Sequence, residues 1–125
     1  MEISADMELI DQQKLARTLY KVVDLLVRHE YTTLKEFCHC EPNIIEWVKR
    51  EIDEWPDTFV MPPSDRLEDI VDTVIERKGT VPQEWFVDVN LWTEGEGISD
   101  LTLQLILTDS DDEYYDVQIQ DMDVL

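Results

Sequence analysis

The last third of the chain alternates between apolar and polar side chains over three consecutive segments. The apolar members, two residues apart within each segment, are Trp85, Val87, Val89 and Leu91, then Leu101, Leu103, Leu105 and Leu107, then Tyr115, Val117 and Ile119. This period is typical of strands with one buried face. The polar stretches EGEG and DSDDE separate the segments and favour short turns. The pattern predicts an antiparallel β-meander of three to four strands.

The beginning of the chain has a helical period instead. Leucines and valines recur three and four residues apart between Leu9 and Leu26. This spacing predicts one amphipathic helix over residues 8–28, capped near Ser4 or Asp6.

Two shorter helices are expected next. Thr33 and Glu36 match a capping box, which predicts a second helix over residues 34–40. Pro42 suits the first turn of a third helix, and Pro56 ends it.

Trp47 and Trp55 fall on the apolar spacing of the third predicted helix, so we expect both in the core. Residues 57–65 contain two adjacent prolines and are expected to form an extended loop. Residues 66–78 fit a helix face and also a β-branched strand, and we favour a strand for 72–77.

These patterns together predict a single α+β domain over residues 1–125, with a helical part (1–56) and a sheet part (66–125). About three N-terminal helices would cover the apolar face of the C-terminal meander. At 125 residues the chain is long enough to bury a core without a metal or a disulfide.

Charge restricts the class of partner. The chain has 30 acidic and 10 basic residues, which gives a net charge of −20, and residues 79–125 contain 12 acidic residues and no Lys or Arg. Such a surface repels nucleic acid and anionic membranes, so we expect a basic protein partner.

No apolar run approaches the ~20 residues of a membrane span. The acidic N-terminus lacks the order of a signal peptide, so a cytoplasmic location is expected.

Metal and cofactor sites find little support. Cys38 and Cys40 flank His39 like zinc ligands, but a second ligand pair is missing, so we expect reduced thiols with a cysteine packed under the first helix. The acidic run 109–113 lacks the glycine and the final glutamate of a calcium loop and is expected to be a solvated turn. No metal and no cofactor is predicted.

Catalytic groups are equally sparse. His29 and His39 are the two candidates for a base near neutral pH, and none of the four serines lies in a nucleophile motif. Because no acid, base and orienting group can be combined, we expect a protein without enzymatic activity.

Aromatic and acidic residues share the second face of the predicted sheet. This combination is typical of a contact surface for a cationic protein. The alternative is that a helix or a bend of the sheet covers this face. The predicted partner-binding residues are Phe86, Asp88, Asn90, Trp92, Glu94, Glu96, Asp111, Asp112, Tyr114 and Asp116.

The stretch WFVDVNLWTEGEGISDLTLQLIL resembles a family of small uncharacterised bacterial domains, which share the LWT motif, the acidic glycine turn and the SDLTL core, and end in an acidic strand like IQDMDVL. In size, charge and architecture the chain also looks like immunity proteins of polymorphic or contact-dependent toxin systems. That likeness implies a cytoplasmic protein that binds and neutralises a basic toxin, most simply a nuclease, by occlusion.

Two alternatives stay open. The chain can be a nucleic-acid mimic that inhibits a DNA-binding protein, which predicts carboxylates spaced like successive phosphates. It can also be a cone-shaped α+β domain for a small ligand or a reaction, which predicts a deep polar cavity.

Overall fold

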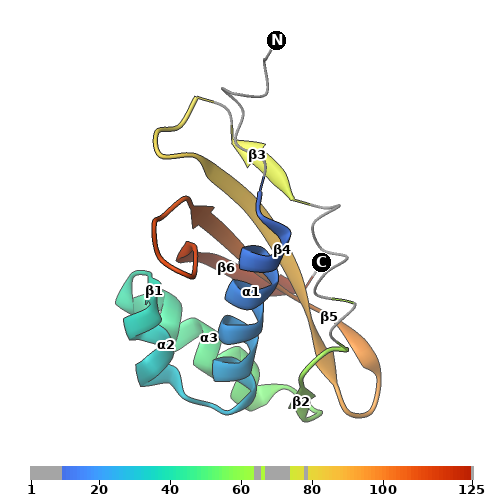
Figure 1. Cartoon of the computed structure of the whole chain (residues 1–125). Coiled ribbons are helices and arrows are strands. Elements are labelled where there is room, and N and C mark those ends of the chain that lie inside the picture. The colour runs from blue at the N-terminus through green and yellow to red at the C-terminus, as the bar shows by residue number, and fades with distance from the viewer. Residues whose placement is uncertain (1–9, 64–65, 67–73, 78, 125) are drawn as a thin grey trace.

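The computed structural model describes residues 10–63, 66, 74–77 and 79–124. Helices α1 (Gln12–Val27), α2 (Tyr31–Phe37) and α3 (Pro42–Glu54) lie on one side of a curled sheet (Figure 1). The strands of the sheet are β1 (Cys38–His39), β2 (Phe59–Val60), β3 (Ile75–Arg77), β4 (Glu84–Thr93), β5 (Gly97–Thr108) and β6 (Asp116–Val124). The predicted α+β class, with N-terminal helices and C-terminal strands, is confirmed.

The sheet is not the simple meander that the alternation predicts. Strands β4, β5 and β6 do form two consecutive antiparallel hairpins. However, β1 pairs in parallel with β6, while β2 and β3 both pair with β4, which gives the order β1-β6-β5-β4-β2. The helical part of the chain therefore contributes an edge strand to the sheet.

The first helix starts later than predicted. It begins at Gln12, and the side chain of Asp11 accepts hydrogen bonds from the backbone N–H groups of Gln13 and Lys14. Asp11 is therefore the N-cap, in the manner usual for aspartate. The predicted caps Ser4 and Asp6 lie outside the described residues.

The second helix is displaced toward the N-terminus. It covers Tyr31–Phe37 instead of residues 34–40, and its N-cap Glu30 makes no side-chain hydrogen bond. The predicted capping box of Thr33 and Glu36 is therefore wrong. The helix ends because Cys38 is extended and joins β6.

The third helix agrees with the prediction at both ends, because Pro42 lies in its first turn and it stops at Glu54. The prediction of a buried Trp47 is wrong: its side chain is 38 % exposed, and its indole N–H donates to the carbonyl of Met122 at 3.0 Å. Trp55 is half-buried and packs against the core beside Phe59.

The predicted alternation places one apolar set on the face toward the helices, which we call the inner face. These side chains pack with the apolar faces of the helices into one core. It includes Leu15, Leu19, Val22, Val23, Leu26, Leu34, Ile45, Val48, Ile52, Trp85, Val87, Val89, Leu91, Leu101, Leu103, Leu105, Leu107, Tyr115, Val117, Ile119 and Met122.

Two irregularities interrupt the strand register. One lies between Asn90 and Trp92 on β4, and the other lies where Gln104 and Leu105 pair with β6.

The strand favoured for 72–77 is found as Ile75–Arg77, and residues 67–73 lie outside the described part. Within the described residues, no helix is long and apolar enough to cross a membrane.

Candidate partner-binding face of the sheet

The face of the sheet directed away from the helices, which we call the outer face, is built from cross-strand rows. Phe86 pairs with Ile106, which pairs with Gln118. The next row along the strands is Asp88, Gln104 and Asp121. Helices α1, α2 and α3 all cover the inner face, and none of these three lies on the outer face (Figure 1).

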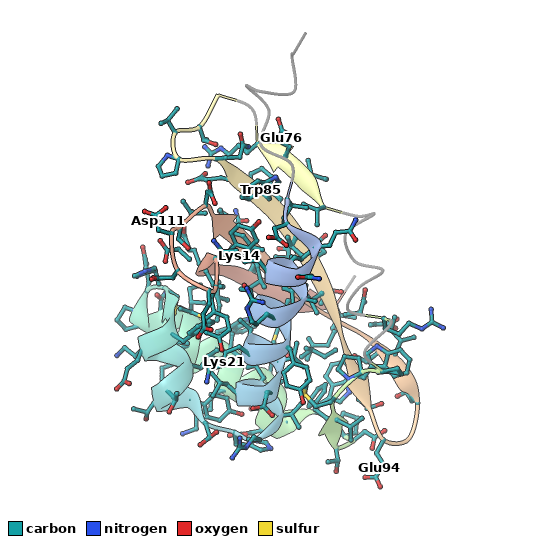
Figure 2. The ribbon with its side chains drawn as sticks, in the orientation of Figure 1. Lys14, Lys21, Glu76, Trp85, Glu94 and Asp111 are labelled. Carbon is teal, nitrogen blue, oxygen red and sulfur yellow. The ribbon has the colours of Figure 1, made fainter. Side chains whose placement is uncertain are left out.

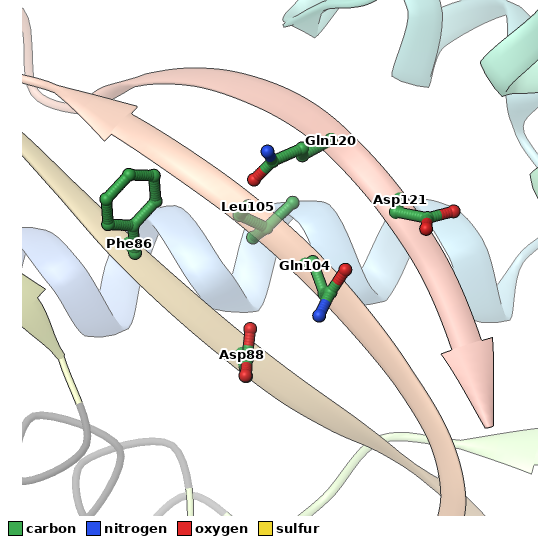
Figure 3. A pocket seen from close by; sticks show the side chains of 6 residues that line it. All are labelled: Phe86, Asp88, Gln104, Leu105, Gln120 and Asp121. Carbon is green, nitrogen blue, oxygen red and sulfur yellow. The ribbon is translucent and has the colours of Figure 1, made fainter. Parts of the chain in front are cut away.

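A hollow of about 490 Å³ opens on the outer face across β4, β5 and β6. Figure 3 shows that its lining side chains come from three neighbouring strands and that α1 lies behind the sheet at this point. The lining residues are Phe86, Asp88, Gln104, Leu105, Gln120 and Asp121.

The polar groups around this hollow are largely unused by the fold. Asp88, Gln104 and Gln120 make no side-chain hydrogen bond to another described residue. The carboxylate of Asp121 accepts one hydrogen bond, from the backbone N–H of Met122 at 2.8 Å. The hollow therefore presents carboxylate and amide oxygens that can accept hydrogen bonds from a ligand.

Few of the carboxylates in the sheet part are neutralised. Among the described residues from 79 to 124, Glu84 alone forms an ion pair, with Arg77 at 2.9 Å. Lys14 and Arg17 on α1 instead bind the backbone carbonyls of Ser110 and Glu113, in the β5–β6 loop. Figure 2 shows Lys14 on the helix side of the sheet, toward the loop that carries Asp111. Among the described residues, Asp88, Asp116 and Asp121 on the outer face therefore form no ion pair, whereas Lys14 and Arg17 bind the β5–β6 loop.

Five of the ten predicted site residues lie on the outer face. Asp88 and Asp116 are exposed, and Phe86 and Trp92 are half-buried. Asn90 has an internal role, because its side-chain amide donates to the carbonyl of Ser99 and to the hydroxyl of Thr102. These bonds stabilise the register shift next to Trp92, so the side-chain amide of Asn90 is used within the sheet.

The other predicted residues lie at the two ends of the sheet. Glu94 and Glu96 occupy the β4–β5 turn, while Asp111, Asp112 and Tyr114 precede β6. The 12 residues of β5 separate these groups by about 40 Å along the strand, at about 3.3 Å per residue. Figure 2 shows Glu94 and Asp111 at opposite ends of the sheet. The predicted residues therefore do not form one compact site.

Tyr114 is not on the outer face, which corrects the sequence-based expectation. It lies in the β5–β6 loop, and its ring packs edge-on against Phe37 of α2 with centroids 5.2 Å apart. It also lines a surface hollow with Tyr20 and Lys21 of α1. The alternation fails here because strand β6 starts only at Asp116.

The comparison with protein families gives one match. The model of the family described as "Domain of unknown function (DUF7668)" matches residues 23–125, which is most of the chain. The chain belongs to this family. No curated protein and no solved structure matches this DUF7668 chain significantly.

Sequence reasoning missed Gln120 and Asp121, which line the hollow of this DUF7668 domain. Opposite Gln104 and Leu105 the strand β6 carries one extra residue, so Asp121 and not Gln120 pairs with Gln104. The signal was present in the sequence: inner-face residues follow every second position until Ile119, and then Met122 comes three positions later. Such a break in period two is the mark of a β-bulge.

The cysteines of the DUF7668 domain are free thiols in the structure. Cys38 is buried, and burial together with the nearby Cys40 raises its pKa. Burial also raises the pKa of Cys40, against the opposing effect of Lys35. Both groups are therefore protonated near neutral pH. No group of three or more metal-ligating side chains is found among the described residues.

The two histidines are both exposed. The Nδ1 atom of His29 lies 3.1 Å from the hydroxyl of Tyr31 and 3.6 Å from a carboxylate oxygen of Asp53. Burial, and then the charge of Asp53, raise the pKa of Tyr31. Across the described residues, no hydrogen bond joins either histidine to a serine or a cysteine.

The β4–β5 turn is held by Asp57, and this contact leads to a pH prediction. Its carboxylate accepts hydrogen bonds from the backbone N–H groups of Thr58 and Gly95, both at 2.8 Å, and these bonds lower its pKa. We expect the carboxylate to stabilise the turn above about pH 4 and to lose this contribution as the pH falls through the lowered pKa. The measurement is the protection factor of the Gly95 amide, which is its hydrogen-exchange rate relative to an unfolded peptide at the same pH, between pH 2 and 7.

Two variants serve as comparison for this prediction. Asp57→Asn should remove the pH dependence of the protection factor at Gly95, because the side chain no longer ionises. Gly95→Ala should open the turn at every pH, because an added Cβ would lie 2.5 Å from a carboxylate oxygen of Asp57. Unchanged exchange in both variants would contradict the role of Asp57.

Proposed function

We propose that this DUF7668 protein is a non-catalytic binding protein that occludes a basic protein partner with the outer face of its sheet. The observation that carries the proposal is the coincidence, on the face directed away from α1, α2 and α3, of aromatic and aliphatic side chains with carboxylates that form no ion pair among the described residues. Asp88 and Asp116 supply charge, while Phe86, Trp92 and Ile98 supply apolar area. Charged rims around aromatic anchors are characteristic of protein interfaces.

The most concrete form of this proposal is an immunity protein against a toxin nuclease in the cytoplasm. A nuclease needs a positive surface to hold phosphate groups, and an acidic inhibitor competes for the same Arg and Lys side chains. Attraction between opposite charges also accelerates association. The small size, the net charge of −20 and the α+β build of the chain support this form.

A nucleic-acid mimic is the second candidate. It shares the charge but needs mainly carboxylates on its contact surface. The outer face instead interleaves them with apolar side chains, among them Ile75 and Ile98, which are 64 % and 59 % exposed. This composition favours a protein contact that includes desolvated apolar area.

A small-ligand or catalytic domain is the third candidate, and it needs a polar cavity beneath the helices. The space between sheet and helices is instead lined by the apolar core. The fully buried polar residues among those described, Thr18, Thr93, Ser99 and Thr102, are each hydrogen-bonded within the chain, and the buried indole N–H of Trp55 is the one side-chain polar atom there without a partner among the described residues. This filled interior favours the binding function.

The test is a binding panel of cationic toxin domains encoded beside genes of this family. We expect at least one nanomolar binder and protection of cells that express it. Asp88→Asn with Asp121→Asn should weaken binding about tenfold or more, because both carboxylates lie on the outer face. The matched control is Glu46→Gln with Glu54→Gln, which removes two exposed charges from α3. A panel without a binder and without protection would refute the proposal.

Salt dependence gives a further prediction for any domain that binds in the panel. Raising the ionic strength from 0.01 to 0.15 M shortens the Debye length from about 30 Å to about 8 Å, so association should slow strongly while dissociation changes little. Asp88→Asn with Asp116→Asn should flatten this dependence. Rate constants from biolayer interferometry provide the measurement, and a salt-independent association rate would contradict electrostatic steering.

A further inference from the structure

We propose that the hollow across β4, β5 and β6 receives an arginine side chain of the basic partner. This inference rests on the proposed function and specifies which residue type the outer face recognises. It is drawn from the arrangement of charge, aromatic surface and hydrogen-bond acceptors around one opening.

The two carboxylates flank the hollow from opposite sides. Asp88 on β4 and Asp121 on β6 both pair with Gln104 on the strand between them. Their Cα atoms are therefore separated by two strand spacings, or about 10 Å. A planar guanidinium has N–H donors on several sides and can bridge such a pair, whereas a lysine ammonium is a compact point charge.

An aromatic ring closes one end of the hollow. Phe86 is the lining residue there, and the guanidinium of Arg77 already lies over its ring, 5.8 Å from the centroid. The fold thus contains one guanidinium contact with this aromatic side chain. Stacking on aromatic rings favours arginine over lysine, because the guanidinium is planar and weakly hydrated.

The remaining polar lining supplies neutral acceptors. The side-chain amides of Gln104 and Gln120 have no hydrogen-bond partner among the described residues. Their carbonyl oxygens can accept the guanidinium N–H groups that the two carboxylates leave unused. The same hollow therefore combines charge, planarity and several acceptors, which is the set that distinguishes arginine from lysine.

Calorimetric titration with two capped hexapeptides, hexa-arginine and hexa-lysine, tests the inference. At equal ionic strength we expect hexa-arginine to bind the full-length protein at least tenfold more tightly. Asp88→Asn and Asp121→Asn should each reduce this preference to threefold or less. Phe86→Leu should reduce it as well, since the aliphatic side chain keeps apolar volume but lacks the aromatic ring.

The control variant is Glu94→Gln with Glu96→Gln in the distant β4–β5 turn, and it should weaken both peptides equally. Melting curves show whether each variant is folded, and the exposed Asp88 makes no hydrogen bond to another described residue that its replacement would remove. Equal affinity for both peptides would overturn the arginine site while leaving a basic partner in place. Failure of both peptides to bind would overturn the arginine site and the proposed function together.

Discussion

Replacing Trp85 by alanine should lower the free energy of unfolding by about 3–5 kcal/mol, the usual range for a buried tryptophan. Trp85 is 3 % exposed and packs against Tyr115, with ring centroids 5.2 Å apart. The substitution therefore removes contacts between β4 and Tyr115, the residue before β6, and leaves a cavity in the core. Urea denaturation monitored by circular dichroism measures the loss.

Trp47→Ala is the matched control for this substitution. Trp47 is 38 % exposed, stacks near Arg50 and donates one hydrogen bond to the carbonyl of Met122. Its loss should therefore cost only about 1 kcal/mol, the net value of one hydrogen bond. Equal destabilisation by the two substitutions would contradict the different burial of the two tryptophans.

Reversing two charges on the outer face, with Asp88→Lys and Asp121→Lys, should weaken binding of a basic partner by about 100-fold or more. The substitution replaces attraction by repulsion at the hollow, and a juxtaposed pair of like charges costs several kcal/mol. The affinity of a domain that binds in the panel, measured at 0.15 M salt, gives the result.

A second double reversal, Glu46→Lys with Glu54→Lys on α3, changes the net charge by the same amount. Because these residues lie on the helix surface, binding should weaken only a few-fold through the long-range field. If both double variants lose affinity equally, recognition depends on net charge and does not involve the outer face.

The central part of the fold was predictable because its pattern is long. Strands β4 and β5 have 10 and 12 residues, and period two is clear over such lengths. The edge strands β1 and β2 have two residues each, which is too short for any period to be recognised. Their position depends on tertiary pairing with β6 and β4, so local sequence could not reveal it.

The candidate site was predictable in its chemistry but not in its extent. The absence of Lys and Arg after residue 78 identified the acidic part directly from the sequence. The turn and loop residues were grouped with the outer face because a sequence does not show distance along a hairpin. Asp121 was overlooked because the bulge in β6 changes which residues point outward.

The pairing of β1 with β6 has a consequence for how the molecule is made. A ribosome completes α1, α2, α3 and β1 before it completes β6, to which β1 hydrogen-bonds across nearly eighty intervening positions, from Cys38 to Val117. The helices therefore leave the exit tunnel with apolar faces that have no sheet to cover. Because contacts so distant in sequence form late, the nascent chain passes through an aggregation-sensitive interval that ends when β6 emerges.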